Sequence, residues 1–521
     1  MDRRSYIGRL VLQLRTAGLE RRLAEGSIAL RRNFFVTVSE IAGFLHPPAV
    51  DCRSASIARS DRGTAAVDAL PPYGSNGSVL PLGQARGSAG EADIGFRTAD
   101  LLGPVYLCGK ARAGKTWLLE SMAIHLAKTG AGLCFVDPHR DAVMELADVL
   151  GNERDLLVVD LMRKDGQLGL NPLEIGDKLD VPDVVARTVG AFQAAYGWSD
   201  RSHPRTLVLA RMATQALVEA NLALPNQMAN TLFQLRPLLV EEDFRDAILK
   251  MSSRPVERYF RTEFPTYEPG ARAPILDKLS ALRADTRTML LFGQSVSAVD
   301  PRLAMDEGGC LLVSLAGLGD KSQLVGSLVV YEFFRAAKAR AEVLASDRRP
   351  FFLICDEVQL YQGDILAAAC GETPKYGLKL ILANQFLSHL DRDVRNAILA
   401  NQSQLISFTT DHADAAALAE EMSEEVTADD LVSLSRFECM ARVTLGRDRL
   451  SAFRARTFNP ADVHRATTTD PSVRRQGTVD LNGGPTREEV EKHQDELEDR
   501  IKDFISTLKG SRHAPTATDK H

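Results

Sequence analysis

The sequence predicts an α/β protein with a mainly parallel sheet that is interrupted by an all-helical insertion. From residue 104 onwards, short and nearly continuous apolar runs alternate with segments of helical periodicity. Such runs are typical of strands that are buried on both faces of a parallel sheet. Between about residues 175 and 298 only helical patterns are found, and apolar runs resume at Gly309. A chain of 521 residues, 45% of them hydrophobic, is long enough to form these cores.

The position of each run predicts the elements of the sheet and its helices. Strands are expected at Val105–Cys108, Leu133–Val136, Leu156–Val159, Cys310–Leu315, Phe351–Cys355, Leu378–Ala383 and Gln404–Phe408. Helices are expected at Trp117–Lys128 and Gln323–Ala341, and within the insertion at Thr206–Ala220, Met228–Leu239 and Glu241–Met251.

The C-terminal part of the chain is expected to form a β-hairpin and a helical tail. The hairpin would pair Glu438–Leu445 with Arg449–Thr457 around a turn at Gly446 to Asp448. The tail is polar and ends in an amphipathic helix with a narrow apolar stripe. This helix is too short for a coiled coil, so we expect it to dock onto the protein's own body. That stripe consists of Val490, Leu497, Ile501, Phe504 and Leu508.

Residues 1–96 are interpreted as a basic N-terminal segment followed by a linker. Many arginines lie among helix-like apolar positions near the start, and residues 49 to about 97 are rich in Ser, Gly, Ala and Pro without periodicity. The arginines suit a flexible arm on DNA and a solvated helix face equally well. The predicted domains are residues 1–96, an α/β core in two parts at 97–174 and 299–460, the insertion at 175–298, and the tail at 461–521.

Composition excludes several classes of protein. The formal net charge of −6 gives no global signature of nucleic-acid binding, so contact with DNA would need a local basic surface. The seven cysteines form no C-x-x-C pair, which indicates buried thiols in a reducing compartment. No apolar run approaches the ~18 residues of a membrane span, and no signal peptide is found. We expect a soluble, cytoplasmic protein.

A phosphate-binding loop is predicted at Gly109-Lys-Ala-Arg-Ala-Gly114-Lys115-Thr116, which matches G-x-x-x-x-G-K-[ST]. Glycines let the backbone wrap a phosphate, and the N-terminus of the following helix directs its dipole at the same group. Lys115 would reach the β- and γ-phosphates of ATP, and the Thr116 hydroxyl would bind Mg²⁺. Nucleotide binding is assigned to Gly109, Ala113, Gly114, Lys115, Thr116 and Trp117.

The second half of the site is predicted where the run from Phe351 ends in Asp356 and Glu357. An apolar strand that ends in two carboxylates is costly without a nearby cation. Asp356 would hold Mg²⁺ through water, and Glu357 would orient and polarise the attacking water. A helix N-terminus is the alternative explanation of this acidic pair. Thr116 and Asp356 are thus the metal candidates, and Glu357 joins Lys115 as a catalytic candidate.

Gln385 completes the set of catalytic candidates. It follows the apolar run Leu380 to Ala383, where the sensor of a γ-phosphate would lie at the C-terminal end of a strand. A polar residue that merely caps the strand is the alternative.

With these residues in place, the chain resembles the HerA/FtsK superfamily of RecA-like P-loop ATPases. Within it, the nearest likeness is to HerA-like and conjugative type IV secretion ATPases, the TraG/TraD-like coupling proteins. The resemblance covers roughly residues 97–460, with a weaker trace at Phe35 to Pro48. It is carried by Phe135-Val-Asp-Pro-His-Arg-Asp141, Gly169-Leu-Asn-Pro-Leu173, Met305 to Leu315, Tyr376 to Gln385, and Phe408 with Asp414-Ala415.

The resemblance implies a homo-hexameric ring that couples ATP hydrolysis to the movement of DNA, or occasionally protein, through a central pore. Each site would then be completed by an arginine of the neighbouring subunit. Pro374 stands where many relatives have the candidate arginine, so Lys375, Arg392, Arg395 or Arg447 could substitute for it.

Two further positions depart from the family. Asn384 replaces a histidine, and Arg140 replaces a glycine. Coupling proteins usually also carry membrane helices, which we do not expect in this chain.

Two functions of different class follow. The first is an ATP-hydrolysing motor for DNA translocation or DNA transfer in a conjugation or type IV secretion system, which contacts the DNA backbone with little sequence preference. The second is a nucleotide-switched assembly component that controls a secretion channel or a defence nuclease. A metabolic P-loop kinase is disfavoured because such kinases do not need a catalytic glutamate beside the aspartate, whereas this chain has Glu357 beside Asp356.

Overall fold

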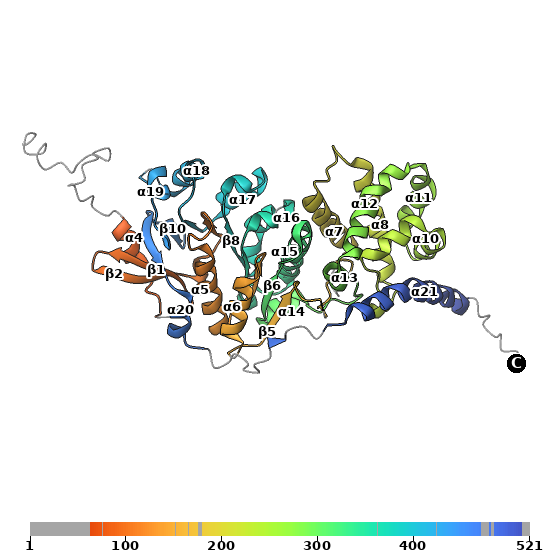
Figure 1. Ribbon diagram of the computed structural model, residues 1–521, viewed down its shortest axis with the longest axis horizontal. Helices are drawn as coiled ribbons and strands as arrows, with labels where there is room; N and C mark the ends of the chain where they lie inside the picture. Colours follow the sequence, from red (N-terminus) through yellow and green to blue (C-terminus); the bar gives the residue numbers. More distant parts are fainter. Residues whose placement is uncertain are drawn as a thin grey trace, which may run out of the picture. The chain divides into compact units, whose positions relative to one another are not determined.

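A computed structural model gives the fold of the chain (Figure 1). It describes residues 63–74, 77–151, 153–164, 166–175, 180–361, 363–423, 425–469, 479–480 and 484–512. The expected N-terminal helix, the arginine-rich arm and the stretch from Phe35 to Pro48 lie outside these residues.

A large sheet organises the described residues. Its parallel part has the order β13 (Val479–Asp480), β5 (Leu156–Asp160), β6 (Cys310–Ser314), β4 (Gly132–Asp137), β7 (Phe351–Cys355), β8 (Leu378–Asn384), β3 (Val105–Cys108) and β9 (Gln404–Ser407). Antiparallel strands continue it as β10 (Glu438–Leu445), β12 (Phe453–Thr457), β1 (Val79–Gly87) and β2 (Gly90–Arg97), while β11 (Asp448–Arg449) pairs with β10. The predicted α/β class with a mainly parallel sheet is confirmed, and each predicted parallel strand ends within one residue of its observed position.

Successive side chains along each strand point to opposite faces of the sheet, so the protein has two hydrophobic cores, one on each face. Val105 and Leu107 of β3 belong to one core, whereas Tyr106 and Cys108 belong to the other, as the two-residue period of a strand requires. Helices cover both faces of the sheet (Figure 1). The first core lies under α5 (Lys115–Lys128) and α6 (Asp141–Leu150), and the second under α15 (Ser322–Ala339), α16 (Asp364–Glu372) and α17 (Arg392–Asn401).

The interpretation of residues 49–96 as a linker is wrong for the part that the structure describes. Gly63–Ala69 form α4, and β1 and β2 form a hairpin that extends the sheet. Small residues obscured the strand pattern because they serve close packing here. A Cβ atom on Gly95 would lie 2.0 Å from the Leu80 carbonyl oxygen of the paired strand, so glycine is required for the pairing.

The expected helical insertion is present between β5 and β6. It comprises α7 (Val181–Tyr196), α8 (Pro204–Asn221), α9 (Leu235–Val240), α10 (Glu242–Leu249), α11 (Arg254–Thr262), α12 (Pro269–Ala284) and α13 (Thr286–Phe292), followed by α14 (Pro301–Glu307). The predicted helix Met228–Leu239 is α-helical only from Leu235, because a capped 3-10 turn at Leu232–Gln234 precedes it. The exact domain boundaries remain a prediction.

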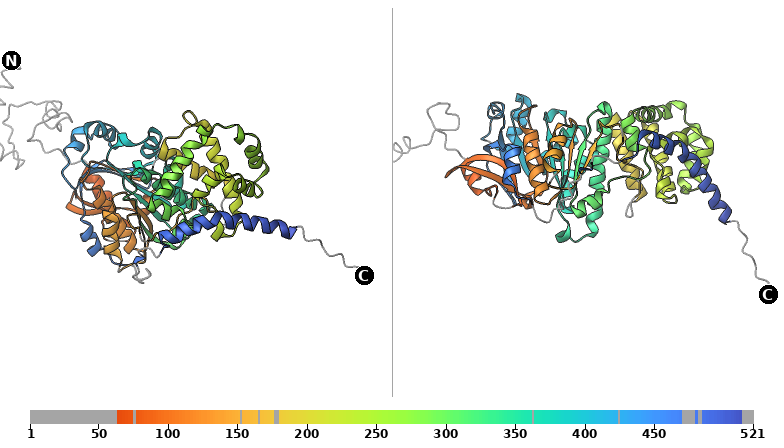
Figure 2. Two further views of the ribbon diagram at one scale, coloured as in Figure 1. Left: turned by 45° about the vertical axis from the view of Figure 1, so that its right-hand side comes forward. Right: turned by 60° about the horizontal axis from the view of Figure 1, so that its bottom comes forward.

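The C-terminal helix α21 (Arg487–Arg512) docks onto the insertion, as its apolar stripe predicted. Figure 2 shows α21 beside the insertion helices in both views. Val490, Leu497 and Ile501 are buried, and Leu508 lies outside the described side chains. Inside the interface, the Gln494 side chain donates a hydrogen bond to the carbonyl oxygen of Gly293 at 2.7 Å and accepts one from the side-chain amide of Gln234 at 3.0 Å. These buried amide contacts fix the helix in one register.

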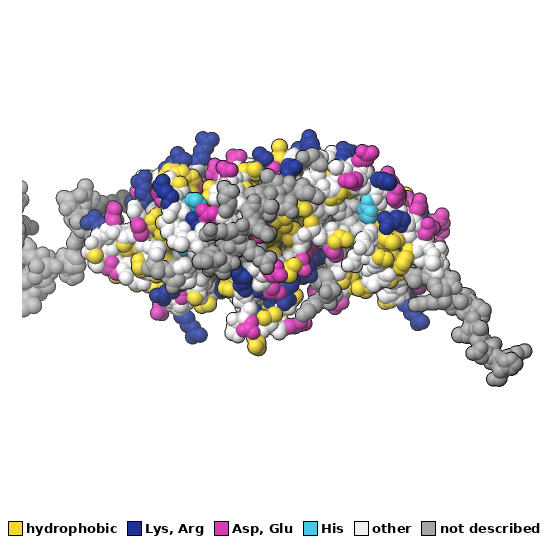
Figure 3. All heavy atoms as spheres, turned by 90° about the horizontal axis from the view of Figure 1, so that it is seen from below, with side chains coloured by type: hydrophobic (Ala, Val, Ile, Leu, Met, Phe, Trp, Pro, Cys, Tyr) yellow, Lys and Arg dark blue, Asp and Glu magenta, His cyan; other side chains and the backbone are white. Residues whose placement is uncertain are grey.

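The remaining expectations from composition concern the surface and the thiols. Figure 3 shows acidic and basic side chains interspersed on one face, which agrees with the small net charge. The six described cysteines are buried and free, as expected, and Cys52 lies outside the described residues. In the described part of the chain, we find no helix with the length and apolar character needed to cross a membrane.

We predict that Leu497→Ala lowers the free energy of unfolding by about 2–5 kcal/mol, because it leaves a cavity in the interface under α21. Leu497 is fully buried. Urea unfolding would measure the change, with Lys492→Ala on the exposed side of the same helix as the control. Equal effects of the two substitutions would contradict the docking of α21.

Candidate nucleotide-binding site

The predicted phosphate-binding loop connects β3 to α5 and has room only for glycine at its two ends. Gly109 and Gly114 have φ angles of 158° and 127°. A Cβ on Gly109 would lie 2.6 Å from the Cβ of Phe408, and one on Gly114 would lie 3.0 Å from the Phe408 ring. Arg112 between them has a positive φ of 61°. This backbone forms the type of concave loop that binds phosphate through its N–H groups.

The first helical residues carry the two polar side chains that the motif requires. The Lys115 ammonium is buried and donates hydrogen bonds to the carbonyl oxygens of Gly109 at 2.6 Å and Lys110 at 3.2 Å. The Thr116 hydroxyl donates to the Asp356 carboxylate at 3.0 Å. The structure therefore brings together the two residues that were predicted to bind Mg²⁺.

The catalytic candidates meet at the ends of β7 and β8, which are neighbours in the sheet. The Gln385 amide donates to one carboxylate oxygen of Glu357 at 2.6 Å. The Gln359 amide donates to the other oxygen at 2.7 Å. Glu357 itself has a positive φ of 52°, a conformation that is uncommon for a glutamate and is enriched at functional sites. Sequence reasoning missed Gln359, whose only signal was its place two residues after Glu357.

The site contains more buried negative charge than positive charge. Burial, followed by the charge of Glu357, raises the pKa of Asp356 to about 6. Burial also raises the pKa of Asp137, one of whose oxygens has no hydrogen-bond partner among the described residues. An environment of this kind disfavours the carboxylate form unless a cation is nearby.

The donor set fits Mg²⁺ held jointly with a nucleotide. Among the described residues, no group of three His, Cys, Asp or Glu side chains is arranged to hold a metal. Mg²⁺ is usually held by one or two carboxylates together with substrate phosphates and water. Thr116 and Asp356 provide the oxygens of the protein, and the glycine-bounded loop beside them provides the place for the phosphates.

The two residues that depart from the family pattern have local structural roles. Asn384 accepts a hydrogen bond from the Tyr106 hydroxyl at 2.6 Å and donates one to the Phe386 carbonyl at 2.7 Å, so it shapes the loop that carries Gln385. Arg140 has a φ of 73°, which glycine adopts more readily. Its guanidinium forms a two-pronged ion pair with Asp160 at 2.8 and 3.0 Å, which holds the backbone there.

The four candidates for the trans arginine lie outside this constellation. The Lys375 ammonium is 4.9 Å from the centre of the Tyr376 ring. The Arg392 side chain is 81% exposed, Arg447 is exposed and Arg395 is partly buried. Among the described residues, none of these four side chains forms a hydrogen bond or an ion pair with Lys115 or Glu357 of the same chain. Their exposure leaves them open to a neighbouring subunit.

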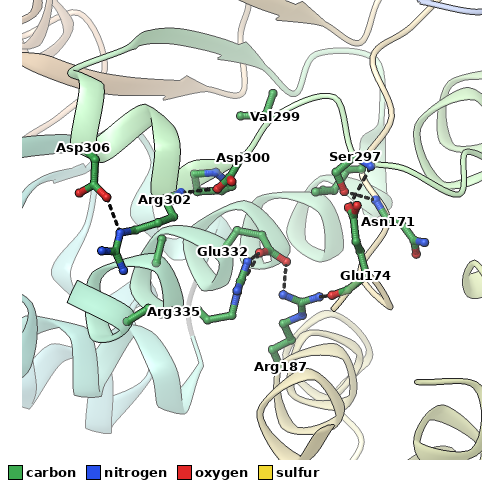
Figure 4. A pocket seen from close by; sticks show the side chains of 14 residues that line it. Asn171, Glu174, Arg187, Ser297, Val299, Asp300, Arg302, Asp306, Glu332 and Arg335 are labelled. Carbon is green, nitrogen blue, oxygen red and sulfur yellow. Dashed lines mark hydrogen bonds and ion pairs between the residues drawn. The ribbon is translucent and has the colours of Figure 1, made fainter. Parts of the chain in front are cut away.

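A polar cavity of about 330 Å³ lies elsewhere, at the junction of the insertion with the core (Figure 4). Arg187 of α7 forms a buried ion pair with Glu332 of α15 at 2.6 Å. The loop that contains Asn171 lies beside it, and the Asn171 amide donates to the carbonyl oxygens of Asn230 and Ser295 at 3.1 and 2.8 Å. These bonds join the core to the insertion and explain the Gly169 to Leu173 string structurally.

Comparisons with known proteins give the fold but no sequence relative. No protein-family model and no curated protein matches the sequence. The unbound bacterial conjugative coupling protein TrwB, without its first 70 residues, superposes with a TM-score of 0.52 at 15% identity over 70% of this chain and 87% of that chain. TrwB in complex with a non-hydrolysable ATP analogue gives a TM-score of 0.51 at 15% identity over 70% and 87%.

A third similar structure is VirB4 of Thermoanaerobacter pseudethanolicus, at 17% identity over 74% of this chain and 97% of that chain, with a TM-score of 0.48. The likeness to TrwB shows that this chain shares its fold.

The acidic surroundings of α5 generate a prediction about pH. Burial and the nearby carboxylates of Glu145 and Asp137 raise the pKa of Glu120 to about 8, from 4.5. The folded chain then binds more protons than the unfolded chain between these values, so stability falls as pH rises from about 4.5 to 8. We predict that Glu120→Gln removes this loss, and that its stabilising effect is larger at pH 8 than at pH 5.

Urea unfolding at a series of pH values would measure the effect. Glu91→Gln, at an exposed position on β2, is the matched control and should leave the pH dependence unchanged. A stability difference for Glu120→Gln that is the same at pH 5 and pH 8 would contradict the prediction.

Proposed function

We propose that this chain is a Mg²⁺-dependent ATPase of the HerA/FtsK superfamily that acts as a DNA-translocating or DNA-transfer motor. The observation that carries the proposal is the joining of three elements: the glycine-bounded loop, the Thr116 to Asp356 hydrogen bond, and the Glu357 carboxylate held by Gln385. A P-loop that served only to bind phosphate would not need the positioned second carboxylate.

Each residue has a defined role in the proposed reaction. The loop N–H groups and Lys115 bind the phosphates, while Thr116 and Asp356 hold Mg²⁺. Bound Mg²⁺ supplies positive charge that offsets the charge of the phosphates. Glu357 orients the attacking water and accepts its proton, and the Gln385 and Gln359 amides fix the direction of its two oxygens. The Lys115 ammonium is bonded to the carbonyl oxygens of Gly109 and Lys110, and binding of the phosphates would exchange these partners for phosphate oxygens.

The wider function rests on the fold. TrwB is a conjugative coupling protein, and the similar structures include its complexes with an ATP analogue and with ADP and Mg²⁺. We propose that this chain likewise serves conjugation or type IV secretion, that it assembles as a homo-hexamer, and that it contacts the DNA backbone with little sequence preference.

A nucleotide-switched assembly component is the second candidate. One observation favours it: Pro374 stands where the candidate trans arginine is expected. A site that lacks this arginine is suited to slow turnover, with ATP binding itself controlling a secretion channel or a nuclease.

We predict that the chain hydrolyses ATP with Mg²⁺, that DNA stimulates the rate, and that the stimulation falls as salt rises from 50 to 200 mM. Glu357→Gln should lower kcat by at least about 100-fold while ATP still binds, because a positioned base contributes about this much. Lys115→Ala should lose both binding and hydrolysis.

Steady-state phosphate release, with Glu420→Gln on the exposed side of α18 (His412–Met422) as the control, would measure these effects. A slow rate that no form of DNA changes, together with ATP-dependent capture of a partner by the Glu357→Gln protein, would favour the switch.

We also predict that one of Arg392, Arg395, Arg447 and Lys375 completes the site of a neighbouring subunit. Alanine at that position should abolish hydrolysis, and mixing the variant with Glu357→Gln subunits should restore part of the rate. Mixing creates some interfaces in which both the glutamate and the trans cation are intact. Arg258→Ala, at an exposed position in the insertion, is the control. Full activity of all four single variants would contradict this assignment.

A further inference from the structure

An aromatic stack lies directly beside the phosphate-binding loop. Trp117, the residue after Thr116, stacks on Phe437 with ring centres 4.1 Å apart and planes inclined by 21°. The guanidinium of Arg436 lies 4.5 Å from the centre of the Phe437 ring. Two aromatic rings and a cation are thus gathered beside the phosphate-binding loop.

This stack does not serve the packing of the protein interior. Within the described part of the chain, neither Trp117 nor Phe437 belongs to either hydrophobic core. Both rings are partly exposed, and Arg436 is exposed. By contrast, Trp198, the second tryptophan of the chain, is buried in a core with Phe192. Large aromatic rings that stay at the surface usually bind another ring or a partner.

The backbone holds Phe437 in place at a cost. Its φ of 66° is an outlier for a bulky residue. The conformation is fixed because its N–H donates to the Ala113 carbonyl of the phosphate-binding loop at 2.8 Å, while its carbonyl accepts from the N–H of Thr457 at 2.9 Å. The Phe437 ring also contacts the position of Gly114. Strain of this kind persists where the surroundings impose it, and it clusters at ligand clamps.

We propose that Trp117 and Phe437 form the subsite for the base of the bound nucleoside triphosphate. The phosphate-binding loop fixes the triphosphate, and the stack offers a π-face next to it, with Arg436 adding positive charge beside the same loop. A base that stacks on such a platform gains affinity without hydrogen bonds to its edge. The inference rests on the proposed function, because it names the part of the ligand that these side chains recognise.

The test compares a ligand with a base and one without. The parent is the full chain with Trp198→Phe, so that Trp117 is the sole tryptophan. The probes are adenosine 5′-(β,γ-imido)triphosphate and inorganic triphosphate, each with Mg²⁺, measured by calorimetry and by tryptophan emission. Trp117→Leu should raise the Kd of the nucleotide on the order of tenfold and leave the Kd of triphosphate unchanged. The nucleotide should change Trp117 emission more than triphosphate does.

Conservative variants separate stacking from mere support of the loop. Trp117→Phe should keep most of the nucleotide affinity, whereas Phe437→Leu should weaken the nucleotide alone, even if Trp117→Leu proves unstable. The proposal is overturned if Trp117→Leu and Phe437→Leu weaken both probes equally, or weaken neither. If triphosphate still binds through Lys115 in those cases, the nucleotide site itself stands. If neither probe binds to the parent protein, the proposed function and this subsite are both ruled out.

Discussion

The burial of two adjacent carboxylates at the end of a central strand is the constraint on which the rest of the structure depends. β7 is paired on both sides by parallel strands and covered on both faces. Asp356 and Glu357 follow directly after this strand and are therefore buried. Charge in such a place is costly unless it is paired or hydrogen-bonded. Neighbouring groups form hydrogen bonds with both carboxylates. Thr116 binds Asp356, two glutamine amides bind Glu357, and Lys115 lies buried nearby. The charge that remains unbalanced is what a metal and its nucleotide would offset.

The sequence predicted most of this site because its signals were local. Strands buried on both faces are read directly from continuous apolar runs, and the loop motif has a fixed spacing, so Lys115, Thr116 and Asp356 could be placed in advance. Other features depend on tertiary contacts and left little local trace. Gln359 looks like any polar residue after a strand, and Phe437 gains its importance from Ala113 far away in the chain. The hairpin β1–β2 was missed because Gly95 and its neighbours resemble a linker, although they serve close strand pairing.

The insertion and the α/β core are joined by buried polar contacts rather than by apolar surface alone. Arg187 and Glu332 form a buried ion pair, and Asn171 binds carbonyl oxygens at two separate points of the insertion. Contacts of this kind tolerate few alternative geometries, because each displaced group would be left buried without a partner. They favour a junction with a small number of discrete arrangements. A motor or a switch requires such behaviour, since binding energy at one site must shift a defined equilibrium elsewhere.

The position of the insertion also determines the order in which the chain can assemble during synthesis. β5 ends at Asp160 and its partner β6 begins at Cys310, so the whole insertion emerges before these neighbouring strands can pair. Until then the edge of β5 is open to any other extended segment, and its second partner, β13, arrives only near the end of the chain. Contacts between strands so distant in sequence form slowly. An unfinished sheet with such open edges is prone to pair with other chains, so the long insertion prolongs this stage of synthesis.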